Sequence, residues 1–209
     1  MLQKKSWLIW GGVGILAILA AFALDGPVDD FLRLDSKTPL YSLAGFLSRI
    51  GDWPPLLLAG LGLVLFFYLR GRREISRLIL LALVAGMLAG FSATIIRSTT
   101  GRTRPSSQVP QGFYGLRYNS HWTVGKYEFG AFPSGHTATV AGLTAAFWLV
   151  RRRWAMVFAV FAVGVAWSRI ALNCHHFSDV VAAMVWGIFI GAWLFRFLDS
   201  TVKTFSVRT

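Results

Sequence analysis

Charged residues are scarce in this chain of 209 residues, of which they make up only 14%. In soluble domains about a quarter of the residues are Asp, Glu, Lys or Arg. The deficit is matched by a hydrophobic share of 55% and a mean hydropathy of +0.57. We therefore expect much of the surface of this protein to face lipid rather than water.

Cysteine and acidic residues are also few. Cys174 is the single cysteine, so no disulfide can form within the chain. Nine Asp and Glu stand against 21 Lys and Arg, which gives a formal net charge of +12. In a soluble protein such an excess would raise nucleic acid as a partner. Here the basic residues fall in short clusters between apolar runs, so they indicate membrane orientation and anionic lipid, and we expect no nucleic-acid partner.

The apolar runs predict an all-α integral membrane protein with six transmembrane helices in one domain, residues 1–209. The runs are Trp7–Leu24, Leu56–Leu69, Leu78–Ile96, Ala138–Val150, Trp154–Trp167 and Val180–Phe195. The first and third reach the roughly 20 residues that a bilayer core requires, and the others reach it when weakly polar flanks are included. A cleaved signal peptide is an alternative for the first run, because Lys4 and Lys5 precede it.

Basic residues in the short connections predict the orientation, since such connections are enriched on the cytoplasmic side. With both termini inside, the inner segments hold Lys4, Lys5, Arg70, Arg72, Arg73, Arg77, Arg151, Arg152, Arg153, Lys203 and Arg208. Residues 25–55 then form an outer amphipathic connection along the membrane interface. The segment 97–133 also falls outside although it is basic, and a phosphate-binding site would explain this exception.

Three polar segments interrupt the apolar chain, and the predicted topology places all three on the outer side. They are Arg97 to Pro105 with Arg102 and Arg104, then Pro133-Ser134-Gly135-His136, then Ser168-Arg169 with His175 and Asp179. Guanidinium groups match the oxygens of a phosphate, and the free N–H groups at a helix start favour an anion. The segments 97–105, 133–136 and 168–179 therefore predict a phosphate site.

Two histidines and a carboxylate suggest the chemistry. His175 and Asp179 are four residues apart, so they share one face if a helix begins near His175. A carboxylate on one imidazole nitrogen fixes the tautomer and leaves the other nitrogen free to attack phosphorus. His136 could then protonate the leaving alkoxide and activate a water molecule. His176 is also within helical reach of Asp179, so spacing alone leaves the choice between His175 and His176 open.

These segments resemble the signature of the type 2 phosphatidic acid phosphatases, the PAP2 superfamily, which shares a catalytic core with vanadium haloperoxidases. The signature is Lys-x6-Arg-Pro, Pro-Ser-Gly-His and Ser-Arg-x5-His-x3-Asp, and its second and third parts are unchanged here. The first part reads Arg97-x6-Arg104-Pro105, with Arg97 where the family usually has Lys. The charge is kept, but Arg and Lys are not equivalent in a tight site, which puts substrate preference and phosphate geometry in question.

The resemblance implies a six-helix fold with a haloperoxidase-like core, a lipid phosphate substrate in the bilayer, and no metal or other cofactor. By position, it implies His175 as nucleophile, Asp179 as its orienting partner and His136 as general acid. It also implies a set of phosphate ligands, namely Arg97, Arg104, Ser134, Gly135 and Arg169. We expect a bacterial inner-membrane lipid phosphatase with cytoplasmic termini and an active site on the periplasmic or outer face.

Other functions stay open on the sequence alone. A zinc site could be built from His121, His136, Cys174, His175 and His176, although no ordinary zinc spacing occurs and the arginines would repel a cation. An anion or lipid transporter would also use intramembrane Arg and His. A lipid phosphotransferase would pass the phosphoryl group to a second lipid instead of water. Candidate substrates are phosphatidylglycerophosphate, phosphatidic acid, a polyprenyl diphosphate and lipid A, and the aromatic loop 106–132 is expected to cover the site.

Overall fold

The computed structural model describes residues 2–198, with side chains placed for residues 9–198. Most of this part of the chain is helical. The helices are α1 (Leu2–Leu32), α2 (Pro39–Ile50), α3 (Trp53–Leu69), α4 (Arg73–Thr100), α5 (Gly135–Val150), α6 (Arg152–Ala171) and α7 (Phe177–Phe197). Between α4 and α5 lie the short strands β1 (Arg117–Tyr118) and β2 (His121–Trp122) and the 3-10 helix η1 (Tyr127–Phe129). The all-α prediction is confirmed, while Lys203 and Arg208, used to orient the C-terminus, lie outside the described residues.

Several of these helices are long and apolar enough to cross a membrane. Within the described residues they are Ile9–Leu32 of α1, together with α4, α6 and α7. The pair of α2 and α3 passes the same test as one span, although it is bent by 60°. α5 has 16 residues, fewer than the roughly 17 that a span across the hydrocarbon core requires. The chain is thus an integral membrane protein with four or five candidate spans, and the six predicted spans are not confirmed.

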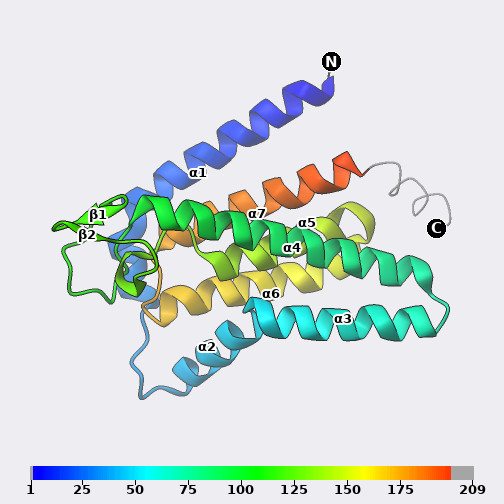
Figure 1. Ribbon diagram of the computed structural model, residues 1–209, viewed down its shortest axis with the longest axis horizontal. Coiled ribbons are helices and arrows are strands. Elements are labelled where there is room, and N and C mark those ends of the chain that lie inside the picture. The colour runs from blue at the N-terminus through cyan, green and yellow to red at the C-terminus, as the bar shows by residue number, and fades with distance from the viewer. Residues whose placement is uncertain (1, 199–209) are drawn as a thin grey trace.

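α5 occupies the centre of the bundle, where it packs against α4, α6 and α7 (Figure 1). Most of its apolar side chains are buried, and Leu143, Ala146 and Phe147 belong to the largest core cluster. Glycine permits the close approach of neighbouring helices, since a Cβ on Gly142 would lie 2.9 Å from the carbonyl oxygen of Ala85. Membrane helices pack through small residues of this kind. This close packing fixes the position of α5 within the bundle.

The end of α1 differs from the prediction, which placed the start of an interfacial connection at Asp25. α1 continues without a break to Leu32, because two of its three carboxylates, Asp25 and Asp29, find partners inside the protein. Arg102 donates a hydrogen bond to Asp25, and the imidazole of His176 lies 2.7 Å from Asp29. A paired carboxylate is tolerated at a depth where an unpaired one would not be, so the prediction ended this helix too early.

α2 is the part of the predicted outer connection that the structure retains. It begins after Thr38, whose side chain caps it, and one face of it packs against α6. Asp52 then caps α3 by accepting a hydrogen bond from the backbone N–H of Trp53 at 2.8 Å. A side-chain cap satisfies one of the free donors at a helix start, so Asp52 fixes the bend between α2 and α3.

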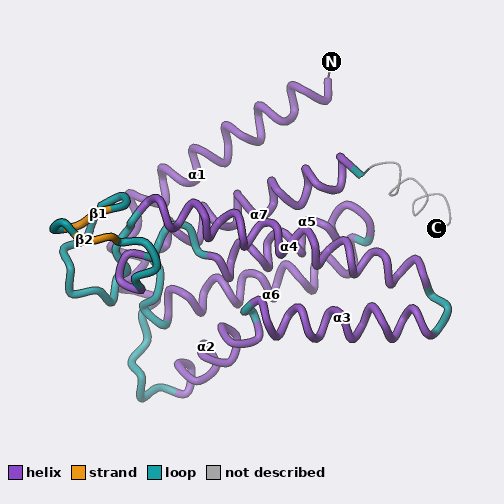
Figure 2. The backbone as a smooth tube through the Cα atoms, viewed as in Figure 1, coloured by secondary structure: helices purple, strands orange, loops and turns teal. Residues whose placement is uncertain are grey.

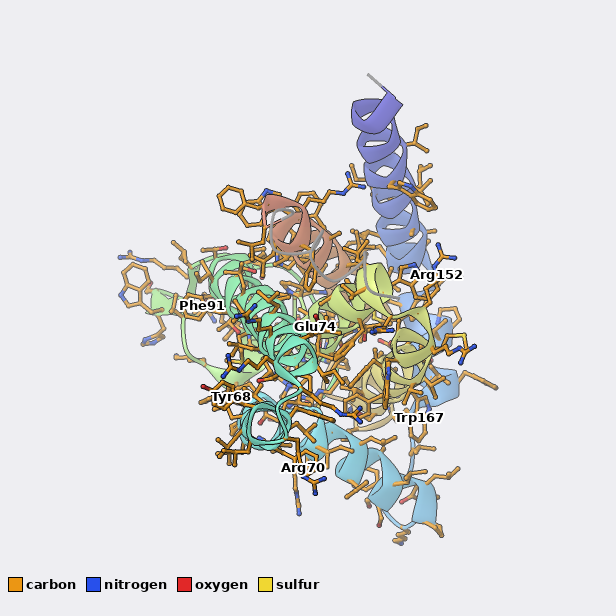
Figure 3. All side chains as sticks on the ribbon, turned by 90° about the vertical axis from the view of Figure 1, so that its right-hand side faces the viewer. Tyr68, Arg70, Glu74, Phe91, Arg152 and Trp167 are labelled. Carbon is orange, nitrogen blue, oxygen red and sulfur yellow. The ribbon has the colours of Figure 1, made fainter. Side chains whose placement is uncertain are left out.

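The connections gather at the two ends of the bundle. Figure 2 shows the 33–38 connection and the long 101–134 segment, with β1 and β2, at one end. Figure 3 looks at the opposite end, where Arg70 follows α3 and Arg152 begins α6. Basic turns therefore lie at one end and the polar segments at the other, as predicted, and the assignment of these ends to cytoplasm and exterior stays a prediction.

Candidate active site

His175 lies in the short turn between α6 and α7, where it is 1% exposed. Its Nδ1 is 2.7 Å from the carbonyl oxygen of Ala131. A carbonyl can only accept, so Nδ1 carries the hydrogen and donates it. Nε2 is buried and has no hydrogen-bond partner among the described residues. The neutral imidazole therefore presents a free lone pair on Nε2.

Three guanidinium groups act on this imidazole, and they belong to Arg169, Arg104 and Arg97. Burial, and then the positive charges of Arg169 and Arg104, hold the pKa of His175 well below its ordinary value of 6.5. Both effects disfavour the charged form of a histidine. His175 is therefore neutral at physiological pH, which is the state that a nucleophile requires.

The arginines are held by contacts that leave donors free. Arg104 donates from Nε to the carbonyl oxygen of Tyr127 at 2.8 Å and stacks on the Tyr127 ring, 3.9 Å from its centroid. Arg169 donates from Nη1 to the hydroxyl of Ser48 on α2, while its buried Nε has no partner within the described residues. A buried donor without a partner is unfavourable. An anion that accepts from Arg169 would supply the hydrogen-bond partner that Nε lacks.

The start of α5 supplies the second part of the site. Ser134 is fully buried, and its Oγ accepts a hydrogen bond from Thr137 at 3.1 Å. Among the described atoms, its side chain makes no capping bond to the helix, so the helix start keeps donors for an anion. A Cβ on Gly135 would lie 3.5 Å from Nη1 of Arg97. The backbone of α5 and the guanidinium on α4 thus face each other closely.

His136 faces a cavity of about 520 Å³. Its Nε2 lies 3.4 Å from Oδ1 of Asp52 at the bend between α2 and α3. The cavity wall consists of Asp52, Trp53, Met87, Gly90, Phe91, Thr94, Arg97, Gly135, His136 and Thr139. The wall combines charged and polar groups with apolar side chains, which suits a ligand with a charged head and an apolar body.

Asp179 is fully buried near the start of α7, close to His175. α7 begins at Phe177 with His176 as its cap, so His175 lies just before the helix and not in its first turn. Oδ2 of Asp179 is 3.7 Å from Nδ1 of His175, which exceeds hydrogen-bond length. It accepts instead from the backbone N–H of His176 at 2.8 Å, while Oδ1 accepts from Arg102 at 2.5 Å. The role of Asp179 in orienting His175 stays a prediction.

The choice between the two adjacent histidines follows from their partners. Nδ1 of His176 is 2.7 Å from Asp29, and its Nε2 is 3.1 Å from Oε1 of Gln111. Both nitrogens of His176 are therefore engaged, whereas one nitrogen of His175 is free. This contrast supports His175 as the reacting histidine without any appeal to spacing.

Several supporting residues were missed by the sequence reasoning. Arg102 joins Asp25 on α1 to Asp179 on α7, and Ser178 donates a backbone hydrogen bond to Asp25 at 2.7 Å. A signal was present, because Asp25 and Asp29 lie four residues apart in an apolar helix and so share one face. The loop 106–132, which is expected to cover the site, contributes the contacts of Tyr127 with Arg104.

A metal site is the alternative to this chemistry. Among the described residues, no three His, Cys, Asp or Glu side chains are grouped so that they could hold a metal ion. The residues that gather around His175 are arginines instead.

Comparison with known proteins gives consistent results. The PAP2 superfamily matches residues 78–203. Lipid A 1-phosphatase of Rhizobium johnstonii is 26% identical over 187 residues, which cover 84% of this chain and 72% of that protein. Lipid A 1-phosphatase of Rhizobium etli is 31% identical over 101 residues, which cover 48% of this chain and 42% of that protein.

Solved structures agree with this match. The transmembrane PAP2-type phosphatidylglycerolphosphate phosphatase of Bacillus subtilis is similar with a TM-score of 0.63 at 16% identity, over 92% of this chain and 96% of that one. LpxE of Aquifex aeolicus is similar with a TM-score of 0.57 at 19% identity, over 83% and 95%. At such identities the likeness concerns the fold, while the match to residues 78–203 covers more than half of the sequence. The chain therefore belongs to the PAP2 superfamily.

Proposed function

We propose that this membrane lipid phosphatase of the PAP2 type hydrolyses the phosphomonoester of a glycolipid of the lipid A class through a phosphohistidine on His175. The observation that carries the proposal is the free, buried Nε2 of His175 among three arginines. The names of the two Rhizobium relatives support the substrate class. Phosphatidylglycerophosphate is the second candidate, because the Bacillus subtilis protein of the same fold is named for that substrate.

In the first step, Nε2 of His175 attacks phosphorus while the bond from phosphorus to the lipid oxygen breaks. Arg97, Arg104 and Arg169 stabilise the charge that spreads over the equatorial oxygens. Protonated His136 gives its proton to the leaving alkoxide. The result is phosphohistidine and a lipid alcohol, and the hydrogen bond from Nδ1 to Ala131 keeps the ring in place throughout.

In the second step, water attacks phosphorus and loses a proton to neutral His136, while the bond to Nε2 breaks. Inorganic phosphate leaves and both histidines return to their starting states. Ser134 and the backbone at Gly135 contribute donors to the phosphoryl group in both steps. The role of Asp179 is electrostatic support of the imidazole from 3.7 Å, with its own charge balanced by Arg102.

We also infer six passes through the membrane, with α5 as the shortest. A helix of 16 residues can complete a span when it is enclosed by α4, α6 and α7, because its ends then meet protein rather than lipid. The polar connections at the 101–134 end would face the periplasm of a bacterial inner membrane, and the basic turns would face the cytoplasm. The substrate would enter from the outer leaflet.

The test is phosphate release by the purified protein in detergent with excess EDTA, on a panel of lipid A 1-phosphate, phosphatidylglycerophosphate, phosphatidic acid and undecaprenyl diphosphate. Wild type is expected to release phosphate fastest from lipid A. His175→Ala is expected to lower the rate at least about 1,000-fold, as for other nucleophile deletions. His121→Ala is the matched control, since His121 is an exposed histidine on β2, and it should match wild type.

Three results would contradict the proposal. Release that EDTA abolishes would argue for metal chemistry. Transfer of labelled phosphate to a second lipid without free phosphate would identify a phosphotransferase. Lipid flux without any phosphate release would identify a transporter.

A further inference from the structure

A carboxylate stands beside the histidine that the proposed function uses as its acid and base. Oδ1 of Asp52 lies 3.4 Å from Nε2 of His136, and both side chains line the 520 Å³ cavity with Arg97. Asp52 precedes the segment 78–203 that matches the family. The match to the family therefore assigns nothing to this residue, and its role has to be argued from its surroundings.

The surroundings of His136 are strongly positive. The charges that face it come from Arg169 on α6, Arg97 on α4 and Arg104 in the connection after α4, and Asp52 is the one that opposes them among the charged groups found to act on it. Three cations around an imidazole disfavour its protonated form. A general acid must nevertheless hold a proton before it can donate one, so the site requires a negative group close to His136.

We propose that Asp52 is the positioning residue of His136, an inference that rests on the proposed phosphatase function. Asp52 accepts the hydrogen on Nε2, which turns the ring so that Nδ1 is the nitrogen that exchanges a proton with the lipid oxygen and then with water. The arrangement follows the general logic of a carboxylate that orients a catalytic imidazole and stabilises its charged form.

The place of Asp52 in the fold suits this role. It lies at the 60° bend between α2 and α3, and it is held there because it also caps α3 through Trp53. Its side chain is 43% exposed and that of His136 is 22% exposed, so both remain open to the cavity where substrate would bind. A fixed carboxylate at the mouth of the site orients the ring without closing the cavity.

The test separates a defect in proton donation from a defect in binding or folding. A general acid matters for a poor leaving group such as the alkoxide of a lipid, and much less for p-nitrophenolate. Asp52→Asn and Asp52→Ser remove the charge but keep an oxygen that can cap α3. We expect both variants to lower kcat on lipid A 1-phosphate about 10- to 100-fold, and on p-nitrophenyl phosphate less than about threefold. Asp52→Glu is expected to restore part of the lipid activity.

The matched control is Asp30→Asn, since Asp30 is a highly exposed carboxylate on α1, and it should leave both rates unchanged. Equal losses on the two substrates would overturn the proposal, and so would a wild-type rate on lipid. Failure of both Asp52→Asn and Asp52→Ser to elute as folded protein would also overturn it, because Asp52 would then be structural. If wild type hydrolysed neither substrate, the proposed function itself would fail, which is a separate result.

Discussion

Two regions of this molecule contribute to the site in different ways. The segment 78–203 that matches the PAP2 superfamily carries the histidines and arginines that would meet substrate. The preceding residues carry none of these, but they provide partners for the side chains of the site. These partnerships are Asp25 with Arg102, Asp29 with His176, Ser48 with Arg169, and Asp52 with His136.

This division shows where charge is balanced in the molecule. The matched segment concentrates cations around His175, as a phosphate site requires. Such a cluster is unfavourable before substrate binds, since like charges repel at short range and burial removes water from each of them. Helices α1 and α2 and the bend before α3 bring three carboxylates and a hydroxyl to the basic side chains of the site, namely Arg102, His176, His136 and Arg169. The first 77 residues thus stabilise a site whose reacting groups they do not supply.

The largest expected effect comes from breaking the junction between the two regions at Arg102. Arg102→Met leaves the buried carboxylate of Asp179 without its cation and removes the partner of Asp25. Loss of one member of a buried ion pair costs about 3–5 kcal/mol. We expect the free energy of unfolding to fall by this amount in an SDS titration followed by tryptophan fluorescence.

Arg33→Met is the control for that measurement. Arg33 pairs with Asp30 at 3.9 Å on the surface of α1, and exposed pairs contribute about 0–1 kcal/mol. If Arg102→Met were as stable as Arg33→Met, the contacts of Asp25 would not join the two regions, and the comparison between them would lose its structural basis.

The same division explains what sequence reasoning could and could not predict. The apolar runs and the local spacings around Arg97, His136 and His175 predicted the main helices and the groups that gather at one end. The partnership of Arg102 with Asp25 spans 77 residues, and that of His176 with Asp29 spans 147. No local pattern encodes such contacts. Asp25 therefore appeared to end a membrane helix, because a carboxylate in an apolar run is unfavourable until its distant partner is known.

The pH dependence of stability is expected to arise in the matched segment alone. The pKa of His175 in the folded protein lies well below 6.5, so the unfolded chain binds a proton below about pH 6.5 that the folded chain does not. Stability therefore falls as pH drops below 6.5, and this term is absent above it. The slope reaches at most about 1.4 kcal/mol per pH unit. Unfolding at pH 7.5, 6.5 and 5.5 should show it for wild type, and His175→Asn should lower the slope.

His121→Asn provides the comparison, because His121 is exposed to solvent on β2 and should leave the slope unchanged. A slope as steep in His175→Asn as in wild type would place its origin elsewhere. A slope that disappears in a variant of the first 77 residues would contradict the assignment of this property to the matched segment.

The smallest expected effect tests whether α2 supports the phosphate ligands. The hydroxyl of Ser48 accepts a hydrogen bond from Nη1 of Arg169, whose Nε has no partner within the described residues. Ser48→Ala removes that acceptor, and a single hydrogen bond to a charged group contributes about 1.5–3 kcal/mol at most. Bound phosphate can take over part of this role, so we expect KM for lipid A 1-phosphate to rise about fivefold, equivalent to roughly 1 kcal/mol, with little change in kcat.

Ser42→Ala, at an exposed serine of the same helix, should alter neither constant. An unchanged KM in Ser48→Ala would mean that Arg169 is held by the matched segment alone, and that α2 itself does not support the phosphate ligands.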